Sequence, residues 1–356
     1  MQDISKVDKN LAVSATIQKD GLCFYDVKKP PFAIYGLLFE NGKFRRMPEQ
    51  AATNVSENIY LLHTFTAGGR VRFRTNSKRI AIQVKLARMG SGIQQPLLGS
   101  SGFDLYMERD GVPVHCRSFP PPAGATDGYE SVVEFLAAEL REITIHFPLY
   151  CEVHDLLIGI EEDAVLEAAA SYRIEKPIVF YGSSITQGGC CSRPGNTYQS
   201  ILCRAIDADH INLGFSGSAK GEPAMTEYIK GLDMSAFVLD YDHNAPTVEH
   251  LAQTHYAMYE GVRKAHPHIP IILLPRPKYH LGGSEPARHE VVLSTYEKAK
   301  AQGDENVYML SGRQLMELAG DDGTVDSVHP NDLGFFSMAQ ALIPLFRTLT
   351  FPEKGL

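Results

Sequence analysis

The first half of the chain, up to about residue 165, alternates hydrophobic and polar residues in short runs. Apolar side chains occupy every second position in RVRFRTNSKRIAIQVKL (70–86), and EITIHFPLY (142–150) repeats this pattern. A period of two places the apolar side chains on one face of a strand, and turn signals such as Asp110-Gly111 separate the runs. We therefore expect an antiparallel β-sandwich or jelly-roll domain over residues 1–165.

From about residue 174 the pattern changes to short apolar runs that alternate with segments of helical period. Strands are expected at IVFY (178–181), INLG (211–214), AFVLDY (236–241), IPIILL (269–274) and NVYML (306–310). Apolar residues recur every three or four positions around 198–206 and 251–262, which indicates helices. Alternating strands and helices predict an α/β domain with a parallel sheet covered on both faces, over residues 174–352. Residues 161–177 are expected to join the two domains.

Length and composition agree with two globular domains. The chain has 356 residues, 44% hydrophobic and 21% charged, close to the average for folded soluble proteins. No apolar run approaches the roughly 20 residues of a membrane helix, so we expect no membrane partner. The first residues have no basic segment followed by an apolar one, which predicts a cytoplasmic protein if Met1 is native.

Net charge and cysteine spacing argue against two further classes of protein, those that bind nucleic acid and those held together by zinc or disulfides. The net charge is −8 and there is no dense basic block, so nucleic acid is not an expected partner. The six cysteines lie outside CxxC or Cys/His ligand spacing, which argues against a zinc site or a disulfide framework. We expect free thiols.

Polar residues follow three of the predicted strands directly. The stretch PIVFYGSSITQGG (177–189) runs from a buried strand into two adjacent serines, Ser183 and Ser184. Gly217 follows the second strand, and Asn244 follows the third. Because ligands bind beyond the carboxyl ends of strands in an open parallel sheet, these ends predict the site.

Acyl transfer needs a hydroxyl nucleophile, a histidine base, a carboxylate that orients the histidine, and donors for the oxyanion. Asp326 precedes His329 by three residues, so both share one face of a turn. Each residue also has an ordinary structural interpretation: serine and aspartate as caps, glycine as a turn residue, asparagine as a side-chain turn. Their order and their placement at strand ends favour a site.

These blocks resemble a known family. GSSIT (182–186), NLGFSG (212–217), DHN (242–244) and DSVH (326–329) resemble the four ordered blocks of the SGNH (GDSL-like) hydrolase superfamily. SGFDLY (101–106) is similar to the signature of the GxDLY-type β domain that precedes the catalytic domain in one branch. The resemblance implies a three-layer, flavodoxin-like catalytic domain and an ester hydrolase without metal or organic cofactor.

The resemblance also implies a role for each matching residue. Ser184 would be the nucleophile, His329 the base and Asp326 its orienting carboxylate. The oxyanion would be bound by the backbone N–H groups of Ser184 and Gly217 and by the Asn244 amide. Two positions depart from the family pattern: Ser183 replaces the usual aspartate, and the block around Asn244 lacks its usual glycine.

The substrate class expected from this resemblance is a small acyl ester, in the first instance an acetyl ester of a carbohydrate or natural product. Three alternatives stay open. The same residues could transfer the acyl group to an alcohol other than water. The N-terminal domain could be a glycan-binding module beside an inactive site, or His243, His266 and His268 with nearby aspartates could hold a catalytic metal.

Overall fold

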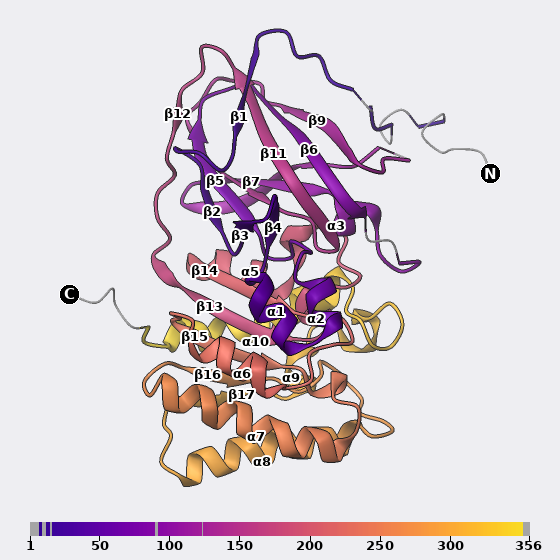
Figure 1. Cartoon of the computed structure of the whole chain (residues 1–356), viewed down its shortest axis with the longest axis vertical. Helices are drawn as coiled ribbons and strands as arrows, with labels where there is room; N and C mark the ends of the chain where they lie inside the picture. Colours follow the sequence, from indigo (N-terminus) through magenta and orange to yellow (C-terminus); the bar gives the residue numbers. More distant parts are fainter. Residues whose placement is uncertain (1–6, 9–11, 15, 90–91, 123, 352–356) are drawn as a thin grey trace.

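The computed structural model describes residues 7–8, 12–14, 16–89, 92–122 and 124–351. Residues 1–6, which carry the signal-peptide expectation, and residue 352 lie outside these ranges. We call β1 to β12 the β region and β13 to α10 the α/β region; Figure 1 shows them stacked along the long axis of the molecule. Among the described helices, none combines the length and apolar character needed to cross a bilayer.

Two antiparallel sheets form the β region. One has the order β1-β11-β6-β9, with bounds Leu22–Asp26, Cys151–Glu161, Arg79–Met89 and Gly128–Glu134. The other has the order β12-β5-β10-β7-β8, with bounds Leu166–Glu167, Arg70–Thr75, Arg141–His146, Phe103–Arg109 and Val112–Phe119, and β2 (Ala33–Tyr35) pairs with β5. Phe73, Ile82 and Ile145 are fully buried in the shared core. The predicted β-sandwich is confirmed.

The turn between β7 and β8 shows how the local sequence sets the pairing. Asp110 and Gly111 have φ angles of 53° and 75°. Positive φ at both central residues is what a tight hairpin turn requires, and aspartate and glycine reach it at low cost. The dipeptide therefore fixes the register of this hairpin.

The α/β region contains a five-stranded parallel sheet of order β14-β13-β15-β16-β17. The strand bounds are Ala208–Gly214, Ile174–Gly182, Ala236–Asp240, Ile271–Leu273 and Val307–Met309. One face packs on α5 (Tyr198–Ile206), α9 (Gly312–Leu315) and α10 (Asp332–Thr348). The other face packs on α6 (Pro223–Lys230), α7 (Val248–Ala265) and α8 (Glu285–Ala301). This is the predicted three-layer arrangement, and the strand order reverses beside β13, where ligands bind in such folds.

The first half of the chain also contains helices that its strand-like pattern did not predict. These are α1 (Glu49–Val55), α2 (Glu57–Leu62) and α3 (Leu97–Ser101). Ala52 of α1 and Ile59 of α2 belong to the apolar core on the α6–α8 side of the parallel sheet. Figure 1 shows both helices lying against the α/β region. The expected linker 161–177 is shorter than predicted, because β12 and the start of β13 fall within it.

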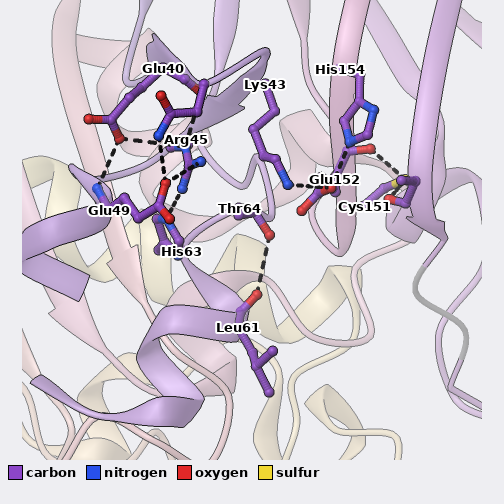
Figure 2. Close-up of polar contacts among 12 residues, drawn as sticks. Glu40, Lys43, Arg45, Glu49, Leu61, His63, Thr64, Cys151, Glu152 and His154 are labelled. Carbon is purple, nitrogen blue, oxygen red and sulfur yellow. Dashed lines mark hydrogen bonds and ion pairs between the residues drawn. The ribbon is translucent and has the colours of Figure 1, made fainter. Parts of the chain in front are cut away.

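A polar network holds the β3–β4 hairpin (Leu38–Glu40, Lys43–Arg45) and α1 to the rest of the β region (Figure 2). Arg45 lies 2.7 Å from a Glu49 carboxylate oxygen and 2.6 Å from His63 Nε2. Lys43 Nζ lies 3.0 Å from Glu152 at the start of β11. Burial, followed by the charge of Arg45, lowers the pKa of His63 to about 4, so this histidine is neutral near pH 7.

Candidate active site

The two adjacent serines have different environments. Ser183 is fully buried, and its Oγ accepts a hydrogen bond from the backbone N–H of Ile185 at 3.1 Å, so it caps α4 (Ser184–Gln187). Ser184 Oγ instead lies 2.9 Å from His329 Nε2. The preceding turn is tight, since a Cβ on Gly182 would lie 2.1 Å from the carbonyl oxygen of Asp240. Glycine there lets the strand end approach β15 and presents Ser184 to the histidine.

Asp326 contacts His329 through both carboxylate oxygens. Oδ2 lies 2.8 Å from His329 Nδ1, and Oδ1 accepts from the backbone N–H groups of Val328 (3.0 Å) and His329 (2.7 Å). Burial alone would raise the pKa of Asp326, but these hydrogen bonds outweigh it and keep the pKa below its usual value. The ionised carboxylate favours the proton on Nδ1, which leaves Nε2 as an acceptor facing Ser184.

Two basic residues after β16 position this turn. Ser327 has a φ of 66°, an unusual conformation for a residue other than glycine. Its carbonyl oxygen accepts from Arg276 Nη2 at 3.0 Å and from Lys278 Nζ at 2.8 Å. Arg276 is itself paired with Glu285, at 2.6 Å. These contacts could not be predicted from local sequence, because the partners lie about 50 positions apart.

The predicted oxyanion donors lie in the same cleft as the serine. Ser184, Gly217, Asn244 and His329 all line a cleft of about 640 Å³. Gly217 has a φ of 65°, which turns the chain after β14 toward the cleft. Asn244 Nδ2 donates to the carbonyl oxygen of Phe215 at 3.1 Å, which fixes its amide beside this loop. An amide carries two N–H donors, so the second can serve a ligand.

The β region supplies one wall of the cleft, which the sequence pattern did not identify by residue. Gly92, Gln94, Gln95 and Tyr150 line it together with the residues of the α/β region. The Tyr150 hydroxyl lies 2.7 Å from Ser216 Oγ. Burial raises the pKa of Tyr150, so the phenol stays protonated. Neither region forms this cleft alone.

Asp240, at the end of β15, has a structural role. Its Oδ2 accepts from Thr186 Oγ1 (2.9 Å) and the Tyr198 hydroxyl (3.0 Å), and burial raises its pKa well above the usual value. These bonds tie α4 and α5 to the end of β15.

Two of the histidines considered as metal ligands, His243 and His266, lie in different places. His243 lines the cleft, and its Nδ1 lies 3.2 Å from Asp242, whereas His266 Nε2 contacts the carbonyl oxygen of Lys230 at 3.0 Å. Within the described ranges, no three or more His, Cys, Asp or Glu side chains are grouped so as to hold a metal ion.

Cys190 and Cys191, in the loop that follows α4, are free thiols. Cys190 lines the cleft, and burial, followed by the charge of Asp326, raises its pKa to about 11. Cys191 is buried against Asp332, and its pKa is raised well above the usual value. All six cysteines, each within the described residues, are free. Neither thiol near the serine is a thiolate at neutral pH.

Comparisons with known proteins agree with this architecture. The model of the GDSL-like lipase/acylhydrolase family matches residues 175–347, and the model of the N-terminus of SGNH-hydrolase-type esterases, GxDLY, matches residues 22–166. No curated protein matches the chain significantly. With both parts matched, the chain is a carboxylic ester hydrolase by class. It belongs to the SGNH (GDSL-like) hydrolase superfamily, in the branch that carries a GxDLY N-terminal domain.

Solved structures similar to the chain cover both regions. A protein assigned to the GDSL-like lipases from Bacteroides ovatus is 26% identical, with a TM-score of 0.82 over 94% of this chain and 100% of that one. A salicylyl-acyltransferase from a tetracycline biosynthetic pathway is 21% identical, with a TM-score of 0.74 over 93% and 99%. An acetyl xylan esterase from Butyrivibrio proteoclasticus is 14% identical, with a TM-score of 0.59 over 92% and 98%. The last two show a shared fold.

Proposed function

We propose that the protein is a serine esterase that removes small acyl groups, in the first instance acetyl, from a carbohydrate or another polar natural product. The observation that carries this proposal is the continuous contact from Ser184 Oγ to His329 Nε2 and from His329 Nδ1 to Asp326, at 2.9 and 2.8 Å. The contact lies at the carboxyl edge of a parallel sheet, inside a cleft. This alignment supports Ser184 as the nucleophile, His329 as the base and Asp326 as the orienting carboxylate.

The proposed reaction has two steps. Ser184 Oγ attacks the ester carbonyl carbon while His329 Nε2 takes the hydroxyl proton. The backbone N–H groups of Ser184 and Gly217 and the Asn244 amide stabilise the oxyanion, and the tetrahedral intermediate collapses as the alcohol leaves with the proton from His329. Water, deprotonated by the same histidine, then releases the carboxylic acid from Ser184.

The walls of the cleft support a polar alcohol as leaving group. Gln94 and Gln95 from the β region and His243 from the α/β region offer amide and imidazole groups beside the serine. Sugar hydroxyls can use such donors and acceptors. The acetyl xylan esterase fold is consistent with this substrate class.

The experiment is hydrolysis of aryl esters of increasing acyl length by the wild-type protein and by Ser184→Ala. We expect the acetate to be cleaved fastest and the variant to lose about 10³-fold or more in kcat. Ser183→Ala is the matched control: it loses a helix cap worth about 1 kcal/mol but keeps the nucleophile, so its kcat should remain near wild type. Equal activity of Ser184→Ala and the wild type would disprove the assignment.

Acyl transfer to another alcohol is a second candidate, which the acyltransferase fold similarity favours. The two reactions share the acyl-enzyme and differ in whether water or an alcohol attacks it. Adding increasing concentrations of a sugar or phenol acceptor to the aryl acetate assay distinguishes them. A hydrolase keeps releasing acetate, whereas a transferase gives the acceptor ester.

A further inference from the structure

A second cavity, of about 330 Å³, lies between the β region and the α/β region. Strands β5 and β10 border it on one side, and the ends of α5 and α10 with the segment before β13 border it on the other. Strand β13 begins beside this cavity at Ile174 and ends at Gly182 beside the nucleophile. Nine residues of strand span roughly 25 Å, so the cavity and the active-site cleft are separate. Its volume is that of a small-molecule site.

Strand β5 carries three arginines on one face. The alternation in RVRFRT buries Val71 and Phe73 in the sandwich core and places Arg70, Arg72 and Arg74 on the opposite face. The two outer arginines have carboxylate partners. Arg70 pairs with Asp209, and Arg74 pairs with Glu142 (3.0 Å) and Glu167 (3.4 Å).

Arg72, the middle arginine, is different. Its side chain is only 8% exposed, its guanidinium lies 4.2 Å from the centre of the Tyr172 ring, and it borders the cavity. Its Nη1 atom is buried and has no hydrogen-bond partner in the described part of the chain. A buried guanidinium without a full set of partners is costly, because it has lost its water without gaining an acceptor.

Two more residues that line the cavity carry a buried nitrogen atom without a partner among the described residues: Arg70 at Nε and His146 at Nε2. His146 lies directly opposite Arg70 in the β5–β10 pairing. Burial and then the nearby arginines lower the pKa of His146 far below its usual value, so it is a neutral hydrogen-bonding group in a positive field.

The remaining charges around the cavity leave it cationic. Arg173, Arg204 and Arg347 also border it, against the carboxylates of Glu108 and Asp207. Asp209 is already bonded to Arg70. Guanidinium groups prefer phosphate and carboxylate oxygens, to which they donate two parallel hydrogen bonds.

We propose that this cavity binds a small anion that carries a phosphate or carboxylate group. Arg72 pairs with the anion, and Arg70 Nε and His146 Nε2 complete its hydrogen bonds. The site is independent of the esterase proposal, because it uses none of the residues of the cleft.

The test is thermal unfolding of the full chain at constant ionic strength, with chloride replaced stepwise by inorganic phosphate, acetate or glucose 6-phosphate. We expect a saturable rise in Tm, since a ligand that binds only the folded state stabilises it by mass action. The anion that saturates the rise in Tm at the lowest concentration identifies the kind of ligand. Glucose 6-phosphate would indicate a phosphate ester, inorganic phosphate would indicate free phosphate, and acetate would indicate a carboxylate.

Two variants remove the site in different ways. Arg72→Met removes the charge, so the saturable rise should disappear. Thr144→Glu places a carboxylate directly opposite Arg72 on β10, where side chains lie about 5 Å apart. We expect it to raise Tm without anion and to abolish the saturable response, which keeps the proposal testable if Arg72→Met fails to fold. Arg74→Met, on the same strand face but with partners outside the cavity, should respond like the wild type.

The proposal is wrong if Arg72→Met or Thr144→Glu keeps the wild-type saturation curve, which would place the anion elsewhere. It is also wrong if the Tm of the wild type rises linearly and equally in every variant, because that is the general effect of excluded salts. Either result would leave the esterase proposal unaffected.

Discussion

The buried carboxylate of Asp104, on β7, accepts a hydrogen bond from Arg193 Nη1 at 2.8 Å and another from the backbone N–H of Gly195 at 2.9 Å. Asp104 belongs to the SGFDLY segment of the β region, whereas Arg193 and Gly195 follow α4, the helix that begins at Ser184. Tyr106 of the same segment donates to the carbonyl oxygen of Gly195 at 3.2 Å. The segment that identifies the N-terminal domain thus joins the two regions at the loop that follows α4.

The first prediction concerns this junction. Burial raises the pKa of Asp104, and Arg193 opposes this shift, so each charge depends on the other. Asp104→Asn should cost about 3 kcal/mol in the free energy of unfolding, because Arg193 would lose its charged partner in a buried setting. We also expect a lower kcat from a displaced nucleophile loop. Urea denaturation and aryl acetate hydrolysis measure the two effects.

The control for Asp104→Asn is the exposed pair Glu260–Lys264 on α7, at 2.8 Å. Glu260→Gln should leave both stability and kcat at wild-type values, because exposed pairs contribute little. If Asp104→Asn were as stable as Glu260→Gln, the junction would not depend on the ion pair.

The second prediction concerns Arg46, which follows β4 and reaches the loop that carries Gly217. Its Nη1 donates to the carbonyl oxygens of Asn212 (3.3 Å) and Gly214, and its guanidinium lies 4.5 Å from the Phe215 ring. Burial lowers its pKa to about 9, so it stays charged near pH 7. Arg46→Met should reduce kcat at least tenfold with little change in KM, because the loop that carries Gly217, a proposed oxyanion donor, would no longer be held in place.

Arg45→Met is the matched control for Arg46→Met, since Arg45 is a buried neighbour whose partners are Glu40, Glu49 and His63 (Figure 2). It should lower stability while the kcat of the folded fraction remains near wild type. An equal loss of kcat in both variants would mean that a general loss of packing around β4, and not the loss of the Gly214 contact, lowers kcat.

Local pattern predicted most of the fold. The period of two in residues 70–86 and the alternation of strand and helix after residue 174 were reliable guides, because each reflects which face of an element is buried. The α1–α2 pair was missed because these helices are short, and their packing surface is on the α/β region rather than on their own sandwich. Helices this short, packed on a distant part of the chain, give no clear apolar period in the local sequence.

The same distinction applies to the site. Ser184, Gly217 and Asn244 follow strands directly, so their common edge could be inferred from the topology. Tyr150 and Arg46 come from the β region and meet the cleft or its loop only through the packing of the two regions. Arg276 and Lys278 act through a backbone carbonyl, which any residue at position 327 would offer. Contacts of this kind join residues far apart in the chain, so they form only when the whole chain is folded.

The third prediction separates orientation from folding in the Ser184–His329–Asp326 contact. In Asp326→Asn the amide oxygen can still accept from the backbone N–H groups of Val328 and His329, so the turn should fold. The amide no longer favours the proton on His329 Nδ1, and we expect kcat to fall by about 10⁴-fold. Asp321→Asn, in the exposed pair of Asp321 with His280, is the control and should keep full activity. Comparable activity of the two variants would contradict the role of Asp326.

The fourth prediction is a pH dependence of stability that originates in the β region. Glu152 is 5% exposed, and its carboxylate contacts His154 Nε2 (2.6 Å) and Lys43 Nζ (3.0 Å), as Figure 2 shows. Burial alone would raise its pKa, but these hydrogen bonds lower the pKa from 4.5 to about 2. A depressed pKa in the folded state means that the ionised group stabilises the fold above pH 4.5 and that this contribution disappears as the pH falls toward 2.

A shift of this size corresponds to about 3 kcal/mol at neutral pH. Glu152→Gln should therefore be less stable than the wild type by about 3 kcal/mol at pH 7, and the difference should shrink to less than half by about pH 3. Urea denaturation between these values measures it, with the exposed Glu317→Gln as a control whose difference from wild type stays near zero. A gap that stayed constant with pH would show that Glu152 stabilises the protein by packing and not as a carboxylate. If the difference in stability between the variant and the wild type shrinks as the pH falls, the ionised Glu152 carboxylate stabilises the junction of β3–β4 with β11.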